Sequence, residues 1–322
     1  MASLPVNGSF ENETALPQEI WSTTNHVVYA ILLITWLPSF VMFVLMVCLF
    51  DRVTTFTEST KYILFMNLMT SDMLYVLLSD LIMMIRFERI SLIRILCCFL
   101  INLSMALQIN STLTITAMAL ERYLAICQPL RYHQLAHRQS GLQVVTGVCL
   151  LSLSVPTIRL LFCVASGPLF MSEYQLVCEM NQLDADMPYG KVAIMIRDTF
   201  LYTEFVFAVL SVATSYVMTA LAAKRASEGR SGFSKARKTI VLHAIQLGLC
   251  LLPVAIPMFY KSVELLRLNA WATHVIRIAV FLALHVFPRF MSPFLYGSRD
   301  EEIVKQVRKL LSSRVHSKRV MP

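Results

Sequence analysis

Two ionisable residues, Glu121 and Arg122, stand near the end of a long apolar run of the chain. Charges at membrane depth are costly, and they tend to be paired or functional. An arginine at a membrane interface can exchange one acidic partner for another at small net cost, which is the chemistry of a switch. The alternative is that Arg122 is a helix-end charge that extends to the lipid headgroups.

The elements that must position these residues are membrane helices. The 322 residues are 57% hydrophobic and 15% charged, which is too apolar for a water-soluble domain. Because open strands cannot satisfy their backbone in lipid, each apolar stretch of about 20 residues is predicted to be a helix. Seven are predicted, at roughly 26–50, 62–86, 94–127, 140–163, 191–223, 238–260 and 271–297. The fold class is therefore an all-α membrane protein, a seven-transmembrane helix bundle.

The flanking segments set the predicted topology. Residues 1–25 are polar and carry N-glycosylation sequons at Asn7 and Asn12, which favours an extracellular tail with no removable signal peptide. With that orientation, the inner side holds about twice as many Lys and Arg residues as the outer side. The net charge of +8 then reflects membrane topology rather than nucleic-acid binding. Domain 26–297 is followed by 298–322, where Arg299 to Leu311 is predicted to form a short amphipathic eighth helix on the membrane surface and the rest a cytoplasmic tail.

The run MALERYLAICQPLRY, Met118 to Tyr132, resembles the end of the third helix of rhodopsin-like (class A) G-protein-coupled receptors. More narrowly, it is similar to the signature of vertebrate odorant receptors, as is KARKTIVLH, Lys235 to His243. The fourth span has no Trp and the fifth lacks its usual Pro, which favours the fish type. The resemblance implies a plasma-membrane chemosensory receptor with a small-molecule ligand, a heterotrimeric G protein as partner and no cofactor. The implied activation residues are Glu121, Arg122, Tyr123, Tyr216, His243, Pro253, Pro293 and Tyr296.

The same resemblance implies a buried polar core around Asp72, since Leu68-x-x-x-Asp72 is similar to the second-helix motif of the family. A lone buried carboxylate needs a partner or a proton, and in this class it faces a sodium pocket with a serine that corresponds to Ser111. The seventh-helix Asn is replaced by Ser292, and Arg289 stands about one turn from Pro293. We expect Arg289 to be a fixed cation for Asp72 that makes sodium unnecessary. The alternative is that Arg289 points to a loop or a water cavity.

The resemblance also implies a disulfide between Cys97, which stands 25 residues before Arg122, and Cys178 in the loop after the fourth span. The alternatives are that the adjacent Cys98 is the partner, or that both are free. Whether Cys98 and Cys163 pair as well is left open. No Cys/His cluster has metal-ligand spacing, and we expect no metal site.

A ligand is expected in the outer third of the bundle, in a mostly apolar cavity with a few polar groups. Ser104 stands where amine receptors of the class carry Asp, which argues against ligands that need that carboxylate. Glu204 could bind a cationic ligand or could pair with Arg197 or Arg159. The predicted lining residues are Leu100, Ile101, Ser104, Met105, Gln108, Phe200, Leu201, Glu204, Phe205, Val254, Ala255, Met258, Phe281 and His285.

Three other functions are alternatives to an odorant receptor. A non-odorant orphan receptor of the same class is the main alternative. A transporter predicts paired repeats and broken helices, and none are visible. An enzyme is not expected, because no H-E-x-x-H, G-x-S-x-G or paired intramembrane aspartates are present.

Overall fold

The computed structural model describes most of the chain from the first apolar segment onward. The described residues are 18–88, 90–168, 174–175, 178, 183–184, 186–187, 189–226, 248–249, 252, 256, 259, 262–263, 266, 268, 270–289, 291 and 302–309. Within them, five long helices contain stretches apolar enough to cross a membrane. These are α1 (Gln18–Arg52), α3 (Thr60–Phe87), α4 (Arg94–Cys127), α6 (Arg138–Ala165) and α9 (Gly190–Ala226).

The first five predicted spans correspond to these five helices, and the chain is a helical membrane bundle. The boundaries differ by a few residues at most, except that α1 begins at Gln18 rather than at 26. The sixth predicted span, 238–260, lies almost entirely outside the described residues. The seventh is represented by α12 (Ala270–Val280) and the π-helical segment η3 (Phe281–Val286), after which helical structure continues to residue 289.

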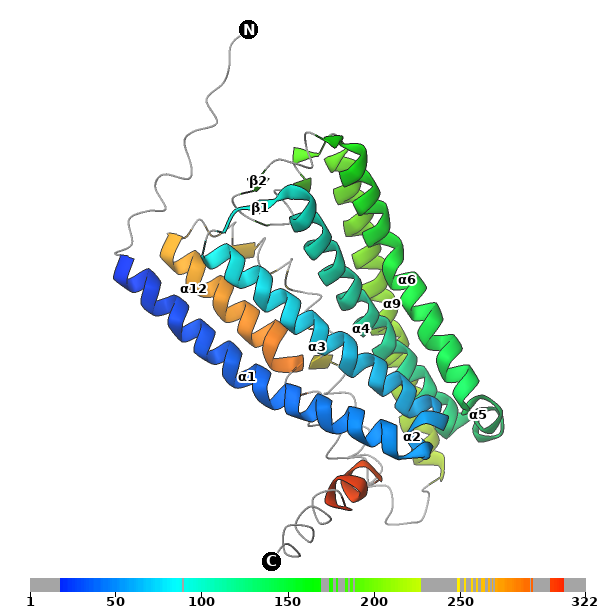
Figure 1. Cartoon of the computed structure of the whole chain (residues 1–322). Helices are drawn as coiled ribbons and strands as arrows, with labels where there is room; N and C mark the ends of the chain where they lie inside the picture. The colour runs from blue at the N-terminus through cyan, green and yellow to red at the C-terminus, as the bar shows by residue number, and fades with distance from the viewer. Residues whose placement is uncertain are drawn as a thin grey trace, which may run out of the picture.

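The short connecting elements mark the two ends of the bundle (Figure 1). At one end lie α2 (Thr54–Glu58) and α5 (Pro129–Leu135), and we call this the α5 end. At the other end, β1 (Leu92–Ile93) pairs antiparallel with β2 (Tyr174–Gln175), and we call this the β end. A proline opens α5 because the first turn of a helix needs no hydrogen bond from its nitrogen.

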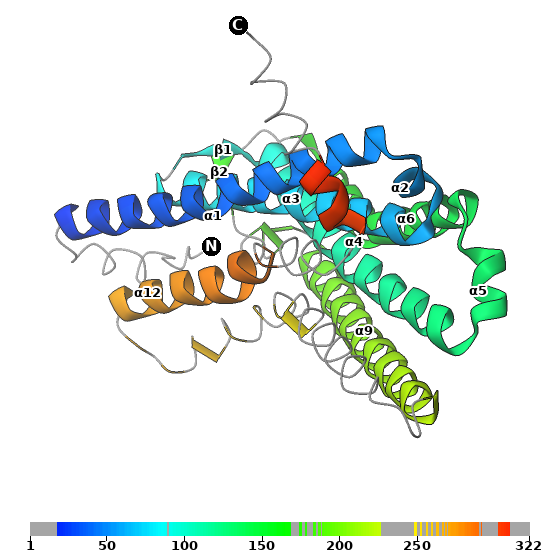
Figure 2. The same ribbon diagram turned by 90° about the horizontal axis from the view of Figure 1, so that it is seen from below.

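Helix α4 occupies the centre of the bundle and packs against α3, α6 and α9. Viewed from below, α9 and α12 lie on the same side of α3 and α4 (Figure 2). Near the α5 end, a cluster of buried side chains from α1, α2, α3, α4, α9 and the helical residues 302–309 forms what we call the α5-end cluster. Its members are Met46, Leu49, Phe56, Tyr62, Leu64, Phe65, Leu68, Met69, Ile115, Met118, Ala119, Val212 and Ile303.

The segment predicted as an amphipathic eighth helix is described over residues 302–309, which are helical. Its apolar residue Ile303 is 2% exposed and belongs to the α5-end cluster, and Val307 packs against that cluster. The apolar face of this helix is therefore covered by the bundle itself. Residues beyond 309 lie outside the described part of the chain.

Helices α3 and α6 come into close contact at Gly141. A Cβ atom at this position would lie 3.0 Å from Ile63 Cδ1 and 3.1 Å from the backbone Cα of Thr60. The hydroxyl of Thr60 also donates to the carbonyl oxygen of His137, at 3.0 Å. The absence of a side chain at Gly141 therefore sets how closely α6 approaches α3, and through α3 the position of the buried polar residues described below.

Candidate functional site

Glu121 and Arg122 lie near the end of α4, and two side chains contact the Glu121 carboxylate. Arg122 Nε lies 3.4 Å from Glu121 Oε2, and the Glu121 side chain is only 7% exposed. The hydroxyl of Tyr132, from α5, donates to the other carboxylate oxygen of Glu121 at 2.6 Å. Tyr132 is the last residue of the run from Met118 to Tyr132, and no role was predicted for it. The structure makes it the second group that orients Glu121.

The other predicted switch residues are only partly described. Tyr216 of α9 is half-buried and packs against the α5-end cluster, and Tyr123 is half-buried at the end of α4. His243, Pro253, Pro293 and Tyr296 lie outside the described residues, as does the motif from Lys235 to His243.

Asp72 is paired with Arg289 in the interior of the bundle. Arg289 Nη1 donates to Asp72 Oδ1, and both side chains are almost fully buried. Ser111 donates to the same carboxylate oxygen at 2.7 Å, and it lies 3.3 Å from the guanidinium. The guanidinium carbon lies 3.9 Å from the centre of the Tyr75 ring, a cation–π geometry. Ser292, the fourth predicted member of this core, lies outside the described residues.

A second polar network surrounds Asn110, which is 5% exposed in the middle of α4. Its Oδ1 accepts hydrogen bonds from Asn67 and Ser71 of α3, both at 2.8 Å. Its Nδ2 lies 3.5 Å from the Ser152 hydroxyl of α6. This network was not predicted from the sequence. The i, i+4 spacing of Asn67 and Ser71 could have indicated a shared polar face.

The predicted α4 and α9 walls of the pocket do meet. Met105 lies with Ile109, Leu113 and Val155 in a buried cluster, and Phe200 and Leu201 of α9 pack against it. Ile101 lies instead in the cluster at the β end. Of the remaining wall residues, three are half-buried: Leu100, Ser104 and Phe205.

Of two polar side chains predicted for the pocket, Gln108 is half-buried and Glu204 is buried. Gln108 Oε1 accepts a hydrogen bond from the Tyr75 hydroxyl at 2.9 Å, and so connects α4 to the Asp72 core. Glu204 is 6% exposed and lies near Thr112 of α4, whose hydroxyl donates to the Gln108 carbonyl oxygen at 3.1 Å. Its Oε1 has no hydrogen-bond partner among the described residues. The expected alternative, a pair with Arg197 or Arg159, is wrong, because both arginines bind Asp184 instead.

Of the predicted seventh-helix wall, only the side chain of Phe281 is described. Phe281 packs in a cluster with Leu32 of α1, Ile278 and Val286, against partly buried Met83 of α3. It opens the π-helical segment η3, and its place in the pocket stays a prediction. The side chain of His285 is not described, and Val254, Ala255 and Met258 lie outside the described residues.

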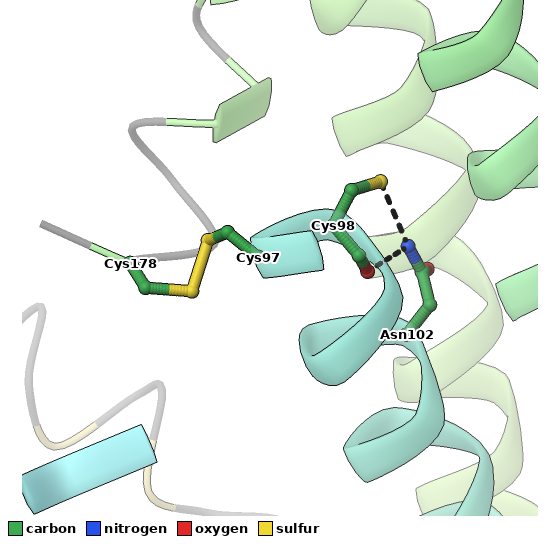
Figure 3. The surroundings of a disulfide bond; sticks show 4 residues. All are labelled: Cys97, Cys98, Asn102 and Cys178. Carbon is green, nitrogen blue, oxygen red and sulfur yellow. Dashed lines mark hydrogen bonds between the residues drawn. A yellow bond between two sulfur atoms is a disulfide. The ribbon is translucent and has the colours of Figure 1, made fainter. Parts of the chain in front are cut away.

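At the β end, the loop that follows α6 is bound to the start of α4. Cys97 and Cys178 form a disulfide across 81 residues of sequence. Figure 3 shows that Cys98, the next residue, projects from a different side of the helix. The disulfide fixes one point of the loop over the ends of α4 and α6.

A buried ionic cluster that sequence analysis missed fixes a second point of that loop. Asp184 is fully buried and binds Arg159 of α6 through one oxygen and Arg197 of α9 through the other, the latter at 2.7 Å. Arg159, also fully buried, donates to Asn102 of α4 at 3.2 Å. A buried carboxylate between two guanidiniums compensates charges that would otherwise be costly. The loop is thus connected to three helices at once.

A family of known proteins matches most of the chain. A sequence model described as "7 transmembrane receptor (rhodopsin family)" matches residues 42–296. "Odorant receptor 131-2" of Danio rerio is 29% identical over 216 residues, 65% of this chain and 63% of that protein. "Olfactory receptor 6K3" of Homo sapiens is 27% identical over 215 residues, 64% of this chain and 60% of that protein. The chain thus spans about three fifths of the length of these relatives.

Proposed function

Because the chain belongs to the rhodopsin family of seven-transmembrane receptors, we propose that it is an odorant receptor that couples small-molecule binding to a heterotrimeric G protein. The observation that carries this proposal is the Glu121–Arg122 pair at the end of α4, held by Tyr132. The names of the relatives, which are odorant and olfactory receptors, support the subtype. The proposed location is the plasma membrane.

In the proposed mechanism, Glu121 is the resting partner of Arg122. Glu121 is almost fully buried whereas the Arg122 side chain is 27% exposed, so the arginine is the member of the pair that an incoming partner can reach. On activation Arg122 leaves Glu121 for the G protein, while Tyr132 keeps a hydrogen bond to the carboxylate. A ligand drives this step only if it binds the open state more tightly than the resting state. Tyr216 is the proposed partner that Arg122 meets when the α5 end opens.

The proposed topology has seven spans with the α5 end in the cytoplasm. The sixth span at 238–260 and the seventh at 271–297 complete the bundle, and Asn7 and Asn12 carry glycans on the extracellular tail. The helix at 302–309 is the proposed eighth helix, at the membrane surface. Its contact between Ile303 and the α5-end cluster supports a place beside the cytoplasmic ends of the spans.

The proposed ligand site lies between α4, α9 and the sixth span, toward the β end. Its wall carries Met105, Phe200 and Leu201, which favour an apolar body on the ligand. Glu204 is the one carboxyl group among the predicted pocket residues, and its Oε1 has no hydrogen-bond partner among the described residues. Since Arg159 and Arg197 are engaged by Asp184, a cationic group on the ligand is the complement that we assign to Glu204.

The test is a second-messenger assay in cells that express the full chain, screened with panels of volatile and water-borne odorants. We expect a concentration-dependent response that is lost in Arg122→Ala, with surface expression of the variant measured on intact cells. Substitutions of Ser104 and Glu204 should change the potency of some ligands and leave that of others unchanged. A response that survives Arg122→Ala at equal surface expression contradicts the proposed mechanism.

A further inference from the structure

Two buried thiols meet at the β end, beside the Cys97–Cys178 disulfide. Cys98 of α4 and Cys163 of α6 are both 0% exposed, and they belong to one buried cluster with Cys97, Cys178, Ile101, Leu183 and Met187. Within this cluster the two thiols are neighbours at the junction of α4 and α6. Both are reduced in the structure.

The orientation of Cys98 is fixed by its neighbours. Asn102, one turn further along α4, donates to the Cys98 carbonyl oxygen at 2.8 Å and to its sulfur at 3.3 Å (Figure 3). Asn102 is held in turn by Arg159 of α6. Successive residues on a helix point about 100° apart, so Cys97 can face the loop while Cys98 faces α6. Bonds from the two cysteines therefore do not compete for the same space.

The neighbouring disulfide shows that this end of the molecule matures in an oxidising compartment, because disulfides form and persist there. The remaining described cysteines are placed differently. Cys48 is exposed, Cys127 lies at the end of α4 near α5, and the Cys149 sulfur accepts a hydrogen bond from Asn110. Among the described free cysteines, only Cys98 and Cys163 are both fully buried and adjacent to another thiol.

We propose that Cys98 and Cys163 form a second disulfide, which joins α4 directly to α6. The bond forms by exchange with a protein disulfide oxidoreductase of the secretory pathway. The thiolate of one cysteine attacks the enzyme disulfide and forms a mixed disulfide. The thiolate of the other then displaces the enzyme sulfur. The receptor loses two protons and two electrons, and the oxidoreductase leaves as a dithiol. Because both sulfurs are buried in the folded bundle, exchange occurs while α6 docks on α4.

The consequence is a β end with two covalent bonds from consecutive residues. Cys97 would hold the loop and Cys98 would hold α6, about one turn of α4 before the Arg159–Asn102 contact. The outer ends of α4 and α6 would then be unable to separate. Any ligand-driven movement would be confined to α9 and the spans that follow it.

The test is a count of free thiols in the full-length receptor, expressed in eukaryotic cells. Cells are treated with N-ethylmaleimide, and the receptor is purified, denatured without reductant in fresh N-ethylmaleimide and analysed by mass spectrometry. Of the eight cysteines, two disulfides leave four to be alkylated, whereas Cys97–Cys178 alone leaves six. We expect four, and a non-reduced peptide map in which Cys163 is linked to the fragment that holds Cys97 and Cys98.

A pair of variants gives the matched control. Cys163→Ser removes one cysteine yet should raise the alkylated number from four to five, because Cys98 becomes free. Cys149→Ser should lower it from four to three. A count of six in the wild type, or a peptide that links Cys98 to Cys178, overturns the proposal. The wild-type count decides the matter even if a variant fails to fold.

Discussion

The guanidinium of Arg289 donates a hydrogen bond to the carboxylate of Asp72 in α3, although the two residues stand 217 positions apart. Both are buried, and the same oxygen of Asp72 also accepts a hydrogen bond from Ser111. The ring of Tyr75 covers the guanidinium. The protein thus supplies its own cation, Arg289, to the Asp72 carboxylate in the middle of α3.

Arg289→Leu is expected to leave Asp72 as a buried charge without a cation. Breaking a buried ion pair from one side typically costs about 3–5 kcal/mol. We therefore expect surface expression to fall several-fold, or basal signalling to change, measured by antibody labelling of intact cells and a second-messenger assay. The double variant Asp72→Asn with Arg289→Leu should recover part of the expression, because no unpaired charge remains. Wild-type expression and signalling in the single variant would contradict this role.

Sodium should have no effect on the resting state if Arg289 fills the cation position at Asp72. Replacing extracellular sodium with choline is expected to leave the agonist concentration–response curve of the wild type unchanged. Arg289→Ala, which frees space beside Asp72, provides the comparison in the same assay. A several-fold sodium-dependent shift in the wild type would show that Asp72 still binds an ion.

Tyr132→Phe is expected to raise basal signalling. The substitution keeps the ring of Tyr132 but removes the 2.6 Å hydrogen bond to Glu121 Oε1, one of the two contacts that hold the carboxylate. Hydrogen bonds to charged groups contribute about 1.5–3 kcal/mol, so even partial loss can shift a two-state equilibrium severalfold. The measurement is ligand-free second-messenger output divided by surface expression. Unchanged or lower output would mean that Tyr132 does not help to hold the resting pair.

Gly141→Ala tests the close contact between α3 and α6. The new methyl group would meet Ile63 at 3.0 Å and the Thr60 backbone at 3.1 Å, and the backbone contact cannot be relieved by a side-chain rotation. Overpacking typically costs about 1–3 kcal/mol. Gly147→Ala in the same helix meets nothing within 4 Å, so its gain in helix propensity makes it neutral or stabilising. The melting temperature of the detergent-solubilised receptor should therefore fall for Gly141→Ala and stay level or rise for Gly147→Ala, and equal shifts would refute the contact.

Glu204→Gln should selectively weaken activation by amines. The amide keeps the size of the side chain but cannot attract a cation, so the potency of cationic agonists should fall about tenfold or more, while neutral agonists of similar shape are little affected. Asp80→Asn is the matched control, because its Oδ1 is also buried without a hydrogen-bond partner among the described residues. A receptor that responds to odorants but never to amines would reject the role of Glu204 and leave the receptor function standing.

The spans that the structure describes were predictable because hydropathy is a continuous signal over many residues, as for α4, whose bounds equal the predicted 94–127. The need of Asp72 for a partner was also predictable, because a carboxylate in an apolar run is costly unless a cation or a proton neutralises it. Asp184 was not found, because it lies in a loop without periodicity and its partners come from two separate helices. The contacts of Phe281 with α1 and α3 were not predicted, because a hydropathy pattern does not show which helices a side chain meets.

Asp184→Asn is expected to be among the most damaging single substitutions at the β end. It removes the negative charge that Arg159 and Arg197 share, while Arg197 keeps its pair with Asp198. Breaking a buried ion pair from one side typically costs about 3–5 kcal/mol. Asp186→Asn is the matched control two residues away, because its pair with Arg94 is long, at 3.4 Å, and Asp186 is 42% exposed. An exposed pair contributes about 0–1 kcal/mol. Surface labelling and detergent melting temperature should therefore fall strongly for Asp184→Asn and barely for Asp186→Asn. If both variants behave alike, the buried cluster does not hold the loop, and the disulfide alone must account for its position.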